Sequence, residues 1–259
     1  MIFKKLIQYS LLSSLLSTTT FALAINSSHQ AIDIAGKQRM FTQRMLKDYS
    51  MIGMKNSFGN PSKDLKKIIN DFEENLKLLK AYTKKSEIKA KISKEMELWR
   101  PIKKRLQAKA NRDKIIQFQE QIDQLLASSN EITNLFVSES GKEQGEIVNL
   151  SGRERMLSQR MASLYMLKVW GVEDSAFQEK MKKSMDEFKT ALLKLESYPL
   201  NSDEINRYLK RVKHSFMFFE IMSRSSTKFI PTLIYQKSNE ILKDMDIVTK
   251  KYVLIESKK

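Results

Sequence analysis

Cysteine is absent from this 259-residue chain, and histidine occurs only at His29 and His214. Without cysteine, the chain can form no disulfide, thiolate metal site or cysteine nucleophile. The two histidines have no metal-ligand spacing around them, nothing near His214 suggests a nucleophile, and no glycine-rich phosphate loop is present. We therefore expect a protein that is not an enzyme and that holds neither a metal nor a cofactor.

Glycine and proline are also scarce, with 7 and 4 residues, and β-branched alternation is nearly absent. Apolar residues recur instead every three to four positions, which predicts an all-α protein. Breaks with turn chemistry, such as 59–62 and 198–202, separate the helices. The predicted helices span 28–57, 62–83, 87–110, 112–139, 146–171, 174–196, 202–223 and 227–255. Within the seventh, residues 214–219 are predicted to be buried.

A ten-residue string occurs twice, at 36–45 and 152–161, with six identical positions and four that keep their character. We call these strings the first box and the second box. Their offset of 116 residues indicates a tandem duplication. Short loops between amphipathic helices imply antiparallel neighbours, so the fold predicted is all-α, with two tandem up-down-up-down four-helix bundles. The expected domains are 25–143 and 144–259.

Chain connectivity places both boxes at the junction between the bundles. In such a bundle the fourth helix ends where the first began, and the second repeat starts directly after 141–145. We therefore expect Arg39 and Arg155 to lie closer to each other than to the far ends of their own bundles. End-to-end stacking through one long helix and side-by-side folding at the glycines both remain open.

The first residues have the pattern of a secretory signal. A basic region, Lys4 and Lys5, precedes an apolar stretch at 6–21, and small residues suited to cleavage end at Ala24. The polar residues within the stretch make it a poor membrane anchor, because an anchor needs about 20 mostly apolar residues. We expect a signal peptide at 1–24, cleavage after Ala24 and a periplasmic protein.

The chain carries a formal net charge of +16, and removal of the two signal-peptide lysines would leave about +14. Such a charge often indicates nucleic-acid binding. Export argues against nucleic acid here, and the lysines are spread along amphipathic helices without interleaved aromatic residues. Most of them are expected to lie on solvated helix faces. A small anion, an acidic partner or a membrane surface fits the charge better.

The helix of the first box has two faces that are not expected to face solvent. At about 100° per residue, Phe41 and Met45 fall on an apolar stripe, while Gly36, Arg39 and Gln43 fall roughly opposite. A glycine inside a helix costs about 1 kcal/mol relative to alanine, which indicates that another group comes close there. Arginine suits planar oxyanions, because its fork of N–H donors meets two oxygens at once.

The second box repeats this layout, so both copies contribute to one predicted anion site. The candidate ligand-binding residues are Gly36, Lys37, Arg39, Gln43, Arg44, Gly152, Arg153, Arg155, Gln159 and Arg160. Methionines are also frequent on the box helices, and thioethers can hold Cu(I) in exported proteins. Methionine at helical spacing more often fills a core, and we interpret these residues as packing.

The pattern A/S-G-[KR]-x-R-M-x-x-Q-R-M resembles the PilJ-type domain at the N-terminus of type IV pilus chemotaxis transducers. It is also similar to the box helix of NarX-type nitrate/nitrite sensor kinases. The resemblance is strongest over 32–53 and 148–171. In the sensor kinases, arginines of paired box helices from two subunits hold nitrate. The resemblance implies that the matching arginines of this chain are Arg39, Arg44, Arg155 and Arg160. In this chain Lys37 or Arg153 follows the glycine, and Gln43 or Gln159 precedes the second arginine, as in the PilJ-like pattern and unlike the sensor kinases. For the PilJ-like pattern the resemblance implies no settled ligand.

A rival hypothesis is an interaction protein. The box faces would then form a homodimer or partner interface, and the arginines would pair with protein carboxylates. No transmembrane helix, kinase or methyl-accepting coil is recognised in the sequence, so a sensor of this kind is expected to act through a membrane-bound signalling partner. The two hypotheses make different predictions for four arginines, which either line a basic cavity or are already paired: Arg39, Arg44, Arg155 and Arg160.

Overall fold

The structure is a computed structural model that describes residues 24–223 and 229–258. The predicted signal peptide lies almost entirely outside the described residues. The described part is helical, and it contains no strand. Its helices are α1 (Ser28–Gly53), α2 (Pro61–Tyr82), α3 (Ser86–Gln107), α4 (Ile115–Ser140), α5 (Lys142–Val169), α6 (Phe177–Glu196), α7 (Asp203–Ser223) and α8 (Pro231–Glu256). None of these helices is long and apolar enough to cross a membrane.

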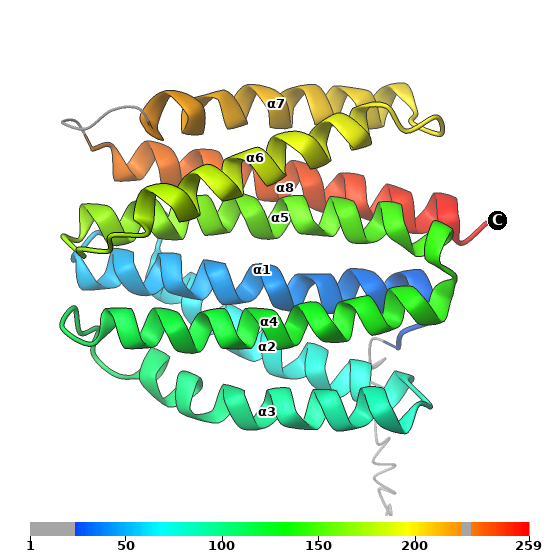
Figure 1. The fold of residues 1–259 in the computed structure, drawn as a ribbon, viewed down its shortest axis with the longest axis horizontal. Coiled ribbons are helices and arrows are strands. Elements are labelled where there is room, and N and C mark those ends of the chain that lie inside the picture. The colour runs from blue at the N-terminus through cyan, green and yellow to red at the C-terminus, as the bar shows by residue number, and fades with distance from the viewer. Residues whose placement is uncertain (1–23, 224–228, 259) are drawn as a thin grey trace, which may run out of the picture.

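The helices form two four-helix bundles, α1–α4 and α5–α8, which lie side by side (Figure 1). The chain turns between them at Gly141, which has a φ of 89°, a conformation that suits glycine. Helices α1 and α5 lie next to each other at the centre of the molecule, and α3 and α7 lie at opposite outer edges. Both central helices start at the end where the chain turns from α4 into α5, so they run parallel. The bundles therefore do not stack end to end.

The predicted helix boundaries differ from the observed ones by a few residues. Helix α1 ends at Gly53, four residues earlier than predicted, because Lys55 takes a positive φ of 58° and the N–H of Asn56 bonds back to the carbonyl of Met51. Helix α2 begins as the turn chemistry predicts: Asn60 caps the N–H of Lys63, and a proline occupies the first turn. The predicted start of the last helix, at 227, lies outside the described residues.

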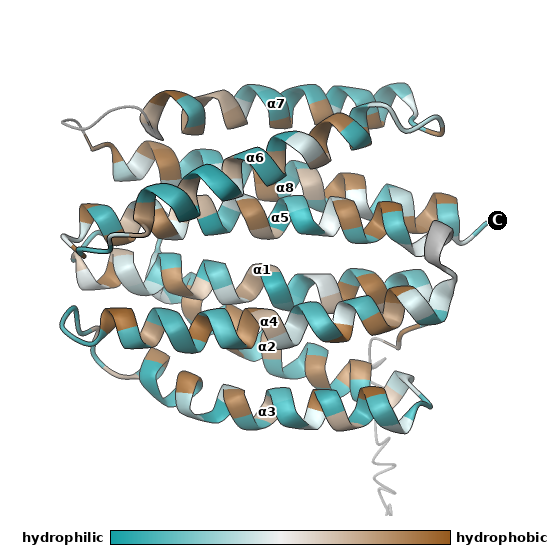
Figure 2. Ribbon diagram, in the orientation of Figure 1, coloured by the Kyte–Doolittle hydropathy of each residue, from teal (hydrophilic) through white to brown (hydrophobic). Residues whose placement is uncertain are grey.

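The two central helices are enclosed by their neighbours. In α1, 19 of 26 residues are buried, because α2, α4 and α5 all pack against it. Figure 2 shows hydrophilic and hydrophobic residues interspersed along α1 and α5, so many polar groups lie in the interior. Such groups are costly unless they are hydrogen-bonded. The box methionines are part of the core, at Met40, Met45, Met156 and Met161.

The outer helices follow the amphipathic pattern more simply. In α7, Phe216 and Phe219 are buried, but His214 and Met217 are exposed. The prediction that all of 214–219 is buried is therefore wrong, because α7 is an outer helix and only one of its faces meets the core.

In the first bundle, Glu95 of α3 is fully buried, and its carboxylate accepts hydrogen bonds from hydroxyls of α4.

Candidate functional site: the paired boxes

The two boxes meet face to face at the contact between α1 and α5. A Cβ atom added to Gly36 would lie 3.3 Å from Nη2 of Arg39 and 3.6 Å from Nη2 of Arg155. At Gly152 the corresponding distances are 3.3 Å to Nη2 of Arg155 and 3.4 Å to Nη2 of Arg39. Both guanidinium groups thus lie over both glycines, in space that a side chain would occupy. The prediction that Arg39 and Arg155 lie close together is confirmed.

Each arginine reaches across to the other repeat, and the two sets of bonds are related by the 116-residue offset. Arg39 donates from Nη2 to the carbonyl oxygen of Asn149 at 3.3 Å and from Nη1 to Oδ1 of Asn130 at 3.1 Å. Arg155 donates from Nη2 to the carbonyl oxygen of Asp33 at 3.4 Å and from Nη1 to Oδ1 of Asp246 at 2.8 Å. The paired boxes therefore form a local two-fold arrangement inside one chain.

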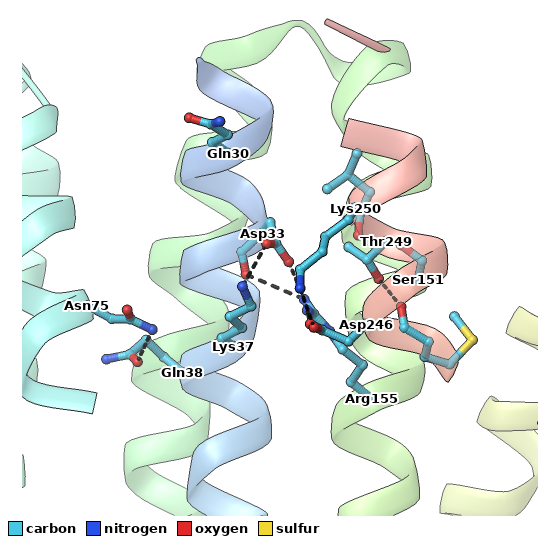
Figure 3. A network of polar contacts seen from close by, with 12 residues as sticks. Gln30, Asp33, Lys37, Gln38, Asn75, Ser151, Arg155, Asp246, Thr249 and Lys250 are labelled. Atoms are coloured by element: carbon cyan, nitrogen blue, oxygen red, sulfur yellow. Dashed lines mark hydrogen bonds and ion pairs between the residues drawn. The ribbon is translucent and has the colours of Figure 1, made fainter. Parts of the chain in front are cut away.

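The charges break this symmetry. Arg155 also donates to Oδ1 of Asp33 at 2.7 Å, so two carboxylates surround it. Figure 3 shows these carboxylates, from α1 and α8, next to Arg155. Lys37 of α1 and Lys250 of α8 contact the same two carboxylates. In the corresponding positions around Arg39 stand asparagines, and no carboxylate of the described residues contacts it. One buried arginine is neutralised, and its counterpart is not.

The pKa directions follow from these surroundings. Burial is the largest cause that lowers the pKa of Arg39, and together with the positive charges of Arg155 and Arg153 it brings that pKa to about 9. Burial also acts to lower the pKa of Arg155, but the carboxylates of Asp33 and Asp246 outweigh it and raise that pKa above its ordinary value. Nε of each arginine is buried with no hydrogen-bond partner among the described residues. The burial of Arg39 is therefore less compensated than that of Arg155.

The other basic box residues lie outside this inner pair, whereas Glu154 is fully buried and its carboxylate oxygens have no hydrogen-bond partner among the described residues. Arg44 makes a two-pronged contact with Asp64, at 2.8 and 2.6 Å. Arg160 lies 3.6 Å from a carboxylate oxygen of Asp123. The residues after the glycines are also paired, Lys37 with Asp33 at 3.0 Å and Arg153 with Glu187 at 2.8 Å. The ten candidate residues thus fall into a buried inner group and a half-exposed outer group.

The two box glutamines are buried and bonded across the interface. Oε1 of Gln159 accepts from Nζ of Lys47 at 2.6 Å, and Oε1 of Gln43 accepts from Oγ of Ser163 at 3.4 Å. Lys47 and Ser163 occupy equivalent positions in the two repeats. The amide of Gln159 also donates to the carbonyl oxygen of Ser238 at 2.9 Å. The glutamines therefore join the two repeats and are not aimed at an open space.

Sequence reasoning missed Lys47, Asp33, Asn130 and Asp246. Nζ of Lys47 is fully buried, bonds to Oδ1 of Asn239 at 2.7 Å and lies 4.2 Å from the centre of a tyrosine ring. Burial lowers the pKa of Lys47 to about 8. The signal for the two aspartates was the difference between the repeats, since asparagine stands at each of their equivalent positions.

Two grooves flank the paired boxes, and they are also equivalent by the repeat. The first groove, of about 650 Å³, lies between α1, α2 and α8; the second groove, of about 550 Å³, lies between α4, α5 and α6. Arg44 lines the first and Arg160 the second, whereas the buried arginines line neither. Asp246 reaches from the first groove to Arg155, and Asn130 reaches from the second groove to Arg39.

No group of three histidine, aspartate or glutamate side chains is placed to hold a metal within the described ranges. The chemistry that the arrangement offers is that of hydrogen-bond donors and charge.

Comparison with known proteins gives one result. The family model described as "Type IV pili methyl-accepting chemotaxis transducer N-term" (PilJ) matches residues 24–128 and 136–215, which is more than half of the chain. No curated protein and no solved structure matches. The matched family is one of chemotaxis sensory domains rather than of enzymes, and its N-terminal domains are typically periplasmic. With the paired box helices that both segments share, the match shows that the chain belongs to the PilJ family of transducer N-terminal domains.

Proposed function

We propose that this protein is a periplasmic, sensory-type binding protein that holds one small anion at Arg39, between the two boxes. The anion is a nitrate-like oxyanion or a carboxylate. The observation that carries the proposal is the unequal treatment of two equivalent buried arginines. Arg155 has two carboxylate partners, whereas Arg39 has only neutral acceptors and is 2% exposed.

An anion would supply the counter-ion that Arg39 lacks. A buried charge without a partner is strongly unfavourable, and a charge-assisted hydrogen bond contributes about 1.5–3 kcal/mol. Nη1 and Nη2 of Arg39 bond only to neutral acceptors and form one end of the planar fork, so two oxygens of one anion can be met together. Gly36 and Gly152 let the guanidinium group lie this close to both helix backbones.

The outer arginines have a different role in this proposal. Arg44 and Arg160 remain bound to Asp64 and Asp123 and help to fix the box helices to their neighbours. Export would depend on a signal peptide at 1–24, and signalling would proceed through a membrane-bound partner.

A second candidate is the interaction protein. Four of the five box arginines already contact carboxylates of this chain, as that hypothesis expects. The box faces lie against each other, so a homodimer or a partner complex would have to use other surfaces.

Calorimetric titration with nitrate, nitrite and acetate tests the anion proposal. We expect at least one of them to bind and to raise the melting temperature, since it binds the folded state. Arg39→Met should weaken that binding about tenfold or more, because one lost contact of about 1.4 kcal/mol is a factor of ten. Lys85→Ala, at an exposed site away from the boxes, should leave it nearly unchanged. Unchanged affinity in Arg39→Met, or no binding of any of these anions, would contradict the proposal.

A further inference from the structure

We propose that the second groove is the entrance to Arg39 and that the ligand is an organic carboxylate. Its charged head would bind Arg39, and its apolar body would lie in the groove. This inference rests on the proposed function, because it names the ligand class and the route for the same arginine.

Asn130 connects the second groove to the buried cation. This residue is exposed, lies on α4 and lines the second groove. Its Oδ1 accepts from Nη1 of Arg39 at 3.1 Å. A carboxylate that enters the groove can therefore take the place of one neutral acceptor on an exposed side chain. The exchange gives Arg39 a charged partner without opening the contact between α1 and α5.

The size and lining of the groove favour a ligand larger than an inorganic oxyanion. Its volume of about 550 Å³ is in the range of sites for small organic molecules, roughly 300–1,000 Å³. A water molecule accounts for about 30 Å³, and a four-atom oxyanion needs only a small part of the groove. Leu126, Met156 and Leu157 supply apolar surface beside Asn130. Arg153 and Arg160, which line the same groove, already contact carboxylates.

The equivalent first groove should not take this ligand. Asp246 stands there in the place of Asn130, and its carboxylate both binds Arg155 and repels an incoming anion. We therefore expect one ligand per chain, bound in the second groove.

A titration series tests the ligand class. Acetate, butanoate and hexanoate are added to the full protein in a calorimeter. Each added CH2 group that enters the groove should tighten binding about fourfold. Nitrate should compete with hexanoate, because both heads need Arg39. Equal affinity for acetate and hexanoate would show that the groove does not hold the body, and lack of competition would show that the head does not reach Arg39.

Two variants add the same charge at different places in the same groove. Asn130→Asp places a carboxylate against Arg39, as in the first groove, and should weaken hexanoate binding at least tenfold. Ala127→Asp is the matched control: residue 127 lines the groove one turn earlier on α4, so the variant should cost about threefold or less through screened repulsion. Asn130→Ala should retain hexanoate binding.

The outcomes separate the two proposals. Equal losses in Asn130→Asp and Ala127→Asp would overturn the entrance through Asn130, while a loss in Arg39→Met would still support the anion site. If Arg39→Met leaves acetate and hexanoate binding unchanged, the anion site itself is wrong and this inference is wrong with it.

Discussion

The two buried arginines provide a matched pair for a stability experiment. Arg39→Met and Arg155→Met make the same chemical change at equivalent positions, at the same depth and beside the same glycines. Methionine fills much of the volume of the arginine stem without a charge. Only the partners left behind differ, so the difference between the variants measures the partners.

Loss of the Arg155 guanidinium leaves two carboxylates behind. Removing one partner of a buried ion pair costs about 3–5 kcal/mol. We expect a value near 3 kcal/mol, because Lys37 still lies 3.0 Å from Asp33 and the Asp246 side chain is 32% exposed. Loss of the Arg39 guanidinium leaves only neutral acceptors and removes an uncompensated charge. Arg39→Met should therefore destabilise the protein by less than about 1 kcal/mol, or stabilise it.

The assay is denaturant unfolding followed by far-ultraviolet circular dichroism, at neutral pH in one buffer without the anions tested above. A loss of about 3 kcal/mol in a chain of this size corresponds to roughly 6–12 °C in melting temperature. Adding Asp33→Asn and Asp246→Asn to Arg155→Met should recover most of the loss, because the second box then has the neutral surroundings of the first. Equal destabilisation by the two arginine variants, or no recovery in the triple variant, would refute the reasoning.

Three further predictions concern other parts of the chain. Burial raises the pKa of Glu95 from 4.5 to about 7, so the folded state holds its proton more tightly than the unfolded state, and stability falls as the pH rises through that interval. Glu95→Gln should therefore be more stable than the wild type by roughly 3 kcal/mol at pH 8 and similar to it at pH 4.5, whereas an equal difference at both pH values in denaturant unfolding would contradict this. Gly53→Ala places a Cβ atom 2.0 Å from the ring of Trp170, whereas the nearest neighbour of a Cβ atom in Gly36→Ala is the end of an arginine side chain at 3.3 Å. Gly53→Ala should therefore lower the melting temperature clearly more than Gly36→Ala, and equal melting temperatures would contradict this. Mass spectrometry of the exported protein should show a mature chain that begins after Ala24, and an intact first residue would rule out the signal peptide.

The elements of the fold could be read from local patterns. Apolar spacing gave the helices, and connectivity alone brought Arg39 and Arg155 together. The side-by-side arrangement could not be read in this way, because it depends on the backbone angle at Gly141 and on which faces of α1 and α5 pack best. Those are properties of three-dimensional contacts between distant segments.

The inner site was predicted only in part. Gly36, Gly152 and the two arginines were identified because both repeats keep them. The decisive neighbours were missed, since Asp33 lies on the helix of the first box but binds the arginine of the second. That assignment needs the parallel contact between α1 and α5. The differences between Asp33 and Asn149, and between Asn130 and Asp246, are visible in the sequence, but the sequence does not say which arginine they surround.

The parallel pairing of α1 with α5 has a consequence for how such a site can change. In a homodimer, one gene supplies both halves, so every substitution appears twice and both halves of a two-fold site must accept it. Here each half has its own codons, and a carboxylate can stand at 246 while an amide stands at 130. The halves are also joined covalently, so their association does not depend on protein concentration. A single chain thus has the geometry of a symmetric dimer and the freedom of a heterodimer, always at a one-to-one ratio.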